Sequence, residues 1–142
     1  MNEIVVSRDL SHDPARVWAR YTDHEGWSSW AGLGRVRLVR RGAPERDGEG
    51  AVRAFSLSPG LREEVVTFER ERLMQYRVTR GPLPIDRHLG EVLFEPRGGG
   101  VGITWRVSFR ALAPGLGGVM ERGLSALFAR VLGALDRDLA RR

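Results

Sequence analysis

The stretch LGGVMERGLSALFARVLGALDRDLARR, from Leu116 to Arg142, decides how the rest of the chain is interpreted. Its apolar side chains recur at gaps of three and four residues, a spacing that places them on one stripe of an α-helix. They are Leu116, Val119, Met120, Leu124, Leu127, Phe128, Val131, Leu132, Leu135 and Leu139. Such a helix, roughly 38 Å long at about 1.5 Å per residue, requires a broad apolar surface to lie on.

The residues before this helix are expected to supply that surface as a β-sheet. Apolar and polar residues alternate in segments joined by short turns, which indicates an antiparallel meander. The expected strands cover residues 3–10, 33–41, 51–57, 61–70, 73–80, 88–95 and 101–112. Two short helices are expected after the first strand, one from Pro14 and one over residues 23–30.

One face of the expected sheet is apolar. In the last strand Ile103, Trp105, Val107 and Phe109 alternate with polar residues, and in the segment 61–70 the alternation places Val66 and Phe68 together. A sheet with one apolar and one charged face packs against another element on one side only, and the long helix is that element. The pattern leaves open whether sheet and helix meet in a solid core or enclose a cavity.

Composition sets further bounds. A chain of 142 residues is expected to form one domain, residues 1–142, that buries a core without disulfides or metal. The absence of cysteine excludes thiol catalysis and cysteine metal sites, and no motif indicates a metal or a cofactor. The net charge is +5, but the 23 basic residues, all arginine, are scattered among acids. We therefore expect no nucleic-acid partner.

The sequence also bears on location. The first residues, MNEIVVSRDL, lack the basic segment and long apolar run of a signal peptide. No apolar run approaches the roughly 18 residues that a transmembrane helix needs. We expect a cytoplasmic protein without integral membrane association, as a monomer or a homodimer.

Several short motifs follow one another in a set order. They are PARVW at 14–18, Asp23 followed by Trp27 and Trp30, GAVR at 50–53, REEV at 62–65, LMQYRV at 73–78 and GGVGITW at 99–105. This series resembles the START-like helix-grip (SRPBCC) superfamily, in its polyketide cyclase/dehydrase and lipid transport branch, over the whole chain. The resemblance implies an α+β fold in which a seven-stranded antiparallel sheet and two short helices wrap around the long C-terminal helix, leaving an apolar cavity. Similar proteins have different activities, so the resemblance does not fix a function.

Eight residues are candidate ligand contacts in such a cavity. They are Trp27, Trp30, Arg53, Glu64, Tyr76, Trp105, Met120 and Leu124. The resemblance implies that the two tryptophans of the short helix lie near the cavity mouth, although both could simply cover the end of the sheet. Tyr76 would bring a hydroxyl to an apolar wall, where it requires a partner from the protein or from a ligand. Met120, near three glycines, marks an adaptable end of the helix where a ligand is expected to enter.

Two further candidates are charged. Arg53 and Glu64 lie on neighbouring expected strands and could form an ion pair. A pair that faces inward would indicate function, because a buried charge is costly unless it is paired or used. A solvated, outward pair is the alternative.

His88 is the candidate for a catalytic role. By alternation it shares a face with Gly90, Val92 and Phe94, the more apolar side of its strand. A histidine there could act as general acid or base on an enolisable ketone. No second histidine or carboxylate has a spacing that commits it to a dyad.

The sequence therefore predicts a protein that binds a hydrophobic small molecule, such as a lipid, polyketide, isoprenoid or aromatic compound, between sheet and helix. An alternative is a cofactor-independent polyketide cyclase/dehydratase that uses the same pocket, and a weaker one is a protein-interaction module. Binding requires only an apolar cavity. Catalysis requires at least two polar groups among His88, Tyr76, Glu64 and Arg53 to converge in one pocket.

Overall fold

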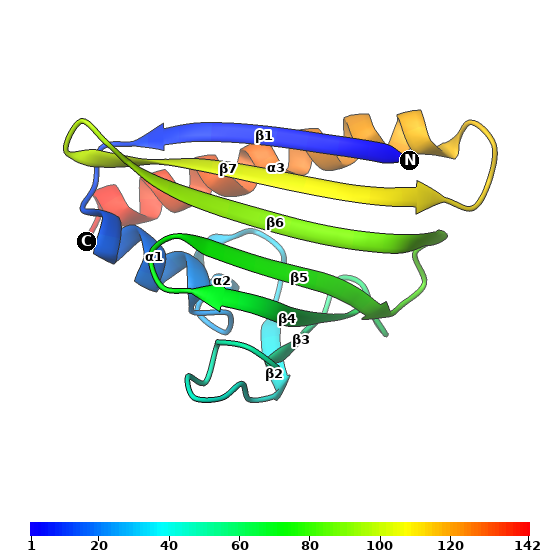
Figure 1. The fold of residues 1–142 in the computed structure, drawn as a ribbon, viewed down its shortest axis with the longest axis horizontal. Helices are drawn as coiled ribbons and strands as arrows, with labels where there is room; N and C mark the ends of the chain where they lie inside the picture. The colour runs from blue at the N-terminus through cyan, green and yellow to red at the C-terminus, as the bar shows by residue number, and fades with distance from the viewer.

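A single antiparallel sheet and three helices make up the computed structural model, which describes residues 1–142 (Figure 1). In chain order the elements are β1 (Asn2–Leu10), α1 (Pro14–Thr22), α2 (Trp27–Trp30), β2 (Val36–Arg40), β3 (Val52–Phe55), β4 (Arg62–Glu69), β5 (Leu73–Arg80), β6 (Ile85–Arg97), β7 (Gly100–Ala111) and α3 (Leu116–Ala140). The seven strands lie in the order β1-β7-β6-β5-β4-β3-β2. The predicted helix-grip fold, with its long C-terminal helix, is confirmed.

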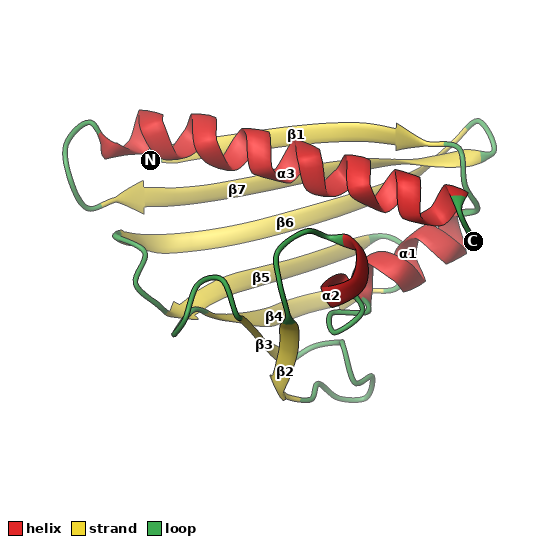
Figure 2. Ribbon diagram, turned by 180° about the vertical axis from the view of Figure 1, so that it is seen from behind, coloured by secondary structure: helices red, strands yellow, loops and turns green.

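The helices all lie on one face of the sheet, as the view from behind shows (Figure 2). This is the face that carries the apolar residues of β7: Ile103, Trp105, Val107 and Phe109 are each 2% exposed or less. The helix α3 runs along β1 and β7, the two strands at one edge of the sheet. The remaining strands curve away from it toward β2, where α2 and the adjoining loops cover the inner face (Figure 2).

Hydrogen bonds and ion pairs connect α3, along its length, to the N-terminal part of the chain. Near its start, the Glu121 carboxylate accepts hydrogen bonds from the Asn2 side chain and from the backbone N–H of Glu3, each at 3.1 Å. Near its end, Asp136 pairs with Arg8 at 2.9 Å, and Asp138 pairs with Arg20 at 2.8 Å.

The apolar stripe of α3 is buried unevenly. Val131, Leu132 and Leu135 are fully buried, whereas Leu124 and Phe128, nearer the start of the helix, are only half-buried. The C-terminal half of α3 is thus part of the solid core. The N-terminal half stands over a space that protein side chains do not fill.

The alternation of β4 is interrupted in its middle. Val65 pairs with Tyr76 and Thr67 pairs with Gln75, so two steps along β4 correspond to one step along β5. This is a β-bulge, and it reverses which residues of the strand face inward on either side of it. Phe68 faces the core as predicted, but Val65 is the buried valine, at 1% exposed, and Val66 is not.

None of the helices is both long enough and apolar enough to cross a membrane.

Because α3 is unevenly buried, shortening its apolar side chains should destabilise the protein by different amounts at different positions. Leu135→Ala should lower the free energy of unfolding by about 2–5 kcal/mol, because it leaves a cavity in a rigid part of the core. Val119→Ala, at a side chain 61% exposed, should change it by less than about 0.5 kcal/mol. Urea unfolding followed by circular dichroism measures both. Equal costs at the two positions would contradict this division of the helix.

Candidate ligand-binding site

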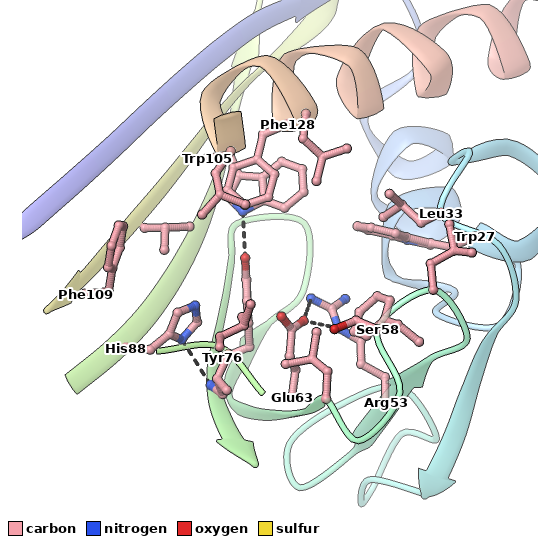
Figure 3. Close-up of a pocket in the computed structure, with 18 of the residues that line it drawn as sticks. Trp27, Leu33, Arg53, Ser58, Glu63, Tyr76, His88, Trp105, Phe109 and Phe128 are labelled. Atoms are coloured by element: carbon pink, nitrogen blue, oxygen red, sulfur yellow. Dashed lines mark hydrogen bonds and ion pairs between the residues drawn. The ribbon is translucent and has the colours of Figure 1, made fainter. Parts of the chain in front are cut away.

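A cavity of about 410 Å³ lies between the sheet and the N-terminal half of α3 (Figure 3). Of the 21 residues that line it, 15 are hydrophobic. They come from β3, β4, β5, β6 and β7, from α2 and α3, and from the loops that precede β2, β4 and β6. Its size and apolar character are those of sites that bind small organic molecules.

Aromatic rings form one wall of this cavity. Trp105 of β7 stacks on Phe128 of α3 with ring centroids 4.1 Å apart, and its indole N–H donates to the Tyr76 hydroxyl at 2.8 Å. Tyr76 leans over Gly90 of the neighbouring strand, where an added Cβ would lie 2.2 Å from the tyrosine ring. The absence of a side chain at position 90 therefore makes room for the phenol. Burial raises the pKa of Tyr76, so the phenol keeps its proton.

A buried ion pair lies beside this aromatic wall. Arg53 of β3, 2% exposed, donates from Nε to Glu63 Oε1 on β4 at 2.9 Å, and its Nη2 atom lies 2.8 Å from the same oxygen. The guanidinium carbon lies 4.7 Å from the centroid of the Tyr76 ring and 5.1 Å from that of Trp27. The Phe55 ring centroid lies 5.6 Å from the same carbon. Three aromatic rings and one carboxylate thus stabilise a charge that has been removed from water.

The expected pair between Arg53 and Glu64 is wrong. Glu64 points to the outer face and pairs with Arg40 at 3.0 Å, where both side chains are at least a third exposed. The bulge after Val65 explains the difference, because alternation counted back from Phe68 across it selects the wrong glutamate. Glu63 is the cavity-lining glutamate that the sequence argument missed, and two adjacent glutamates offered no signal to choose between them.

His88 lies beside Tyr76, with ring centroids 5.5 Å apart. The regular pairing of β5 with β6 stops at Tyr76 and Gly90, and the register of β6 shifts between Asp86 and Leu89. In place of a backbone carbonyl, the Nδ1 atom of His88 accepts a hydrogen bond from the backbone N–H of Val78 at 3.0 Å (Figure 3). A nitrogen that accepts carries no proton, so the neutral ring carries its proton on Nε2.

The environment of His88 favours this neutral form. Burial lowers the pKa of the imidazole below its ordinary value of 6.5, and the Arg53 charge lowers it further, although the Glu63 carboxylate opposes both. At neutral pH His88 is therefore uncharged.

Arg53, Glu63, Tyr76 and His88 together form what we call the polar pole of the cavity (Figure 3). His88 Nε2 and Glu63 Oε2 make no hydrogen bond within the protein, and neither is among the fully buried polar atoms that lack a partner. Arg53 Nη1, by contrast, is fully buried and has no partner. A molecule in the cavity can thus reach a donor on His88 and an acceptor on Glu63.

The structure brings together most of the candidate residues. Trp27, Arg53, Tyr76, His88, Trp105 and Leu124 line the cavity, and Glu64, Trp30 and Met120 do not. Trp30 is displaced because it packs behind Trp27, with ring centroids 5.2 Å apart, and Met120 lies one helical turn before Leu124 against the core. Leu33, Phe55, Phe109 and Phe128 also line the cavity. Phe109 and Phe128 belong to the apolar patterns of their strand and helix. The positions of Leu33 and Phe55 depend on the geometry of a loop and of a strand end.

A second hollow, of about 370 Å³, lies beside the β3–β4 connection and is polar. Its side chains include Arg35, Arg37 and Arg62, and it contains no carboxylate. No group of three or more His, Asp or Glu residues in the structure could hold a metal ion.

The fold and the cavity define a helix-grip protein with an apolar chamber between its sheet and its long helix. The sequence matches the model of the family described as polyketide cyclase/dehydrase and lipid transport over residues 1–140, and the chain belongs to that family. A comparison with curated proteins found no match.

Similar solved structures support the fold. A protein from Thermobifida fusca, determined by solution NMR, is 24% identical, with a TM-score of 0.83 over 99% of this chain and 95% of that one. Ara h 8.0201 is 13% identical, with a TM-score of 0.79 over 99% and 98% of the two chains. DynU16, described as a putative protein in the dynemicin biosynthetic locus, is 19% identical, with a TM-score of 0.72 over 99% of this chain and 48% of that one.

The two neighbouring glutamates provide a direct test of the ion-pair assignment. Glu63→Gln should lower the free energy of unfolding by about 3 kcal/mol or more, because it leaves the Arg53 charge buried without a counter-charge. Glu64→Gln should cost less than about 1 kcal/mol, because its pair with Arg40 is solvated. Chemical unfolding of the two variants measures both, and a larger loss from Glu64→Gln would show that the inward glutamate has been assigned wrongly.

The ring of His88 provides a second test. At pH 7, long-range ¹H–¹⁵N NMR should show Nδ1 unprotonated and Nε2 protonated, with a titration midpoint below 6.5. The unfolded chain, with an ordinary histidine pKa, takes up the proton at higher pH than the folded state. The contribution of His88 to stability is therefore present above about pH 6.5 and declines as the pH falls toward the folded-state pKa. A proton on Nδ1, or a midpoint above 6.5, would refute the arrangement.

Proposed function

We propose that this protein binds a hydrophobic small molecule in the cavity between the sheet and α3. The observation that carries the proposal is the cavity itself, about 410 Å³ with 15 of its 21 lining residues hydrophobic. Family membership supports it, since the family's description includes lipid transport. The half-buried side chains of Leu124, Leu127 and Phe128 are the part of α3 that a ligand would cover.

The structure of α3 is suited to ligand entry and release. Its C-terminal half is held by the core and by the pairs of Asp136 and Asp138, so it forms a fixed end. Its N-terminal half has fewer buried side chains and follows Gly115, which adopts a left-handed conformation at φ 77°. A small outward movement of this half would break only the hydrogen bonds of Glu121 to Asn2 and Glu3, and would widen the cavity without disturbing the core.

A second candidate function is cofactor-independent catalysis, such as dehydration of a β-hydroxy ketone within the cavity. The observation that favours it is the convergence of Arg53, Glu63, Tyr76 and His88 in one apolar chamber. In such a step the Glu63 carboxylate would remove a proton from the carbon that lies between the carbonyl carbon and the hydroxyl-bearing carbon. A carbon–carbon double bond would form as the carbon–oxygen bond breaks, and protonated Glu63 would return the proton to the departing hydroxyl, which leaves as water. A carrier would release its ligand at the original mass, and a dehydratase would release a product lighter by one water molecule.

Native mass spectrometry of the protein purified from its own cells should reveal a bound apolar molecule. Titration with the fluorescent probe N-phenyl-1-naphthylamine should give saturable binding, because the probe is apolar and its rings can stack on the aromatic wall.

Filling the cavity should abolish probe binding. Leu124→Trp adds volume on the cavity side of α3, whereas Val119→Trp adds the same side chain at an exposed position of the same helix. Binding should be lost in the first variant and kept in the second, with both proteins folded by circular dichroism. If the wild-type protein fails to bind the probe, or if both variants bind it equally, the cavity is not the binding site.

A further inference from the structure

The polar pole is selective in the hydrogen bonds that it offers. His88 Nδ1 is occupied by the backbone N–H of Val78, so the remaining ring nitrogen, Nε2, is a donor. In the close-up this nitrogen points away from the strand and into the cavity (Figure 3). Both contacts of Arg53 are with Glu63 Oε1, so Oε2 is a free acceptor. The rest of the lining is largely apolar and offers a ligand few alternative partners.

An entirely apolar ligand would fit this cavity poorly. It would displace water from His88 Nε2 and Glu63 Oε2 and give neither a new partner. Leaving a desolvated donor or acceptor unpaired costs more than a typical hydrogen bond contributes, and the cost is larger for a charged carboxylate. A ligand that supplies the complementary groups avoids this penalty and keeps the full benefit of its apolar contacts.

We propose that the ligand is an aromatic or polycyclic molecule with a carbonyl-type oxygen that accepts from His88 Nε2–H and a hydroxyl that donates to Glu63 Oε2. This inference rests on the proposed function, and it narrows the ligand to oxygenated ring compounds as opposed to plain hydrocarbon chains. Rings are favoured because Trp105, Phe128 and Tyr76 place aromatic side chains in the lining of the cavity. Flat rings can pack against this wall with little loss of their own conformational freedom.

The same geometry assigns different roles to the two residues. Neither nitrogen of neutral His88 is free to accept a proton, because one receives the Val78 N–H and the other already carries a proton. His88 is therefore a recognition residue that holds an oxygen, and in the second candidate function the role of base falls to Glu63. Arg53 positions Glu63 by binding its other oxygen.

A matched series of naphthalenes tests the proposal in the unmodified protein. The probes are 2-ethylnaphthalene, 2-acetylnaphthalene and 6-acetyl-2-naphthol, which share a ring system and add first a carbonyl and then a hydroxyl. Calorimetric titration should show each added group tightening binding about fivefold, which is the effect of one net hydrogen bond. If all three bind with equal affinity, the proposal about the polar pole is overturned while the proposed function stands. If none binds, the proposed function itself fails.

A variant then identifies the donor. His88→Phe should bind 2-ethylnaphthalene about as well as the wild-type protein does and should lose the roughly fivefold preference for 2-acetylnaphthalene. His12→Phe is the matched control, because His12 pairs with Asp136 outside the cavity and its loss should leave the preference unchanged. If the preference for the ketone persists in His88→Phe, another group binds the oxygen and the assignment is wrong.

Discussion

The ion pair between Arg53 and Glu63 is the constraint on which the character of the cavity depends. Both side chains are nearly excluded from water, at 2% and 13% exposed, in a wall that is otherwise apolar and aromatic. A charge in such a place persists only when it is paired, and Arg53 has a single carboxylate partner. The Tyr76 and Trp27 rings lie against the guanidinium, and Trp105 in turn binds the Tyr76 hydroxyl. The orientation of the aromatic wall is therefore coupled to the position of one charge.

Most of the architecture could be predicted because it depends on periodicity. The alternation in β7 and the three-and-four spacing in α3 each extend over many residues, so local exceptions do not obscure them. Alternation also placed His88 on the more apolar side of its strand without deciding whether it faces inward, and in the structure His88 lines the cavity. Its hydrogen bond to Val78 could not be predicted, because it arises where the β5–β6 ladder ends and a side chain replaces a backbone acceptor.

The inner face of β4 shows where such reasoning fails. A single inserted residue reverses the alternation, and nothing in the run Val65-Val66-Thr67 marks the position of the bulge. The sequence left open whether Arg53 forms an inward or an outward ion pair and named Glu64 as its partner, whereas position 63 faces Arg53 inside the protein and position 64 faces solvent. Trp30 and Met120 illustrate a related limit, although each lies on the expected element. The Trp27 ring separates Trp30 from the cavity, and Met120 lies one helical turn away from it. Bulges and packing depths are set by tertiary contacts that no short window of sequence contains.

The free-energy cost of burying the polar pole is evidence about the ligand of the cavity. Replacing a buried ion pair by well-packed apolar residues is often neutral or stabilising, so stability alone does not explain Arg53 and Glu63. A protein that held only hydrocarbon would function as well with apolar side chains at these two positions. The pole also leaves two polar atoms, His88 Nε2 and Glu63 Oε2, without protein partners beside an apolar space. Both features have a physical explanation if the ligand itself carries oxygen at that end. The polar pole, and not the larger apolar surface, is then what distinguishes one ligand from another.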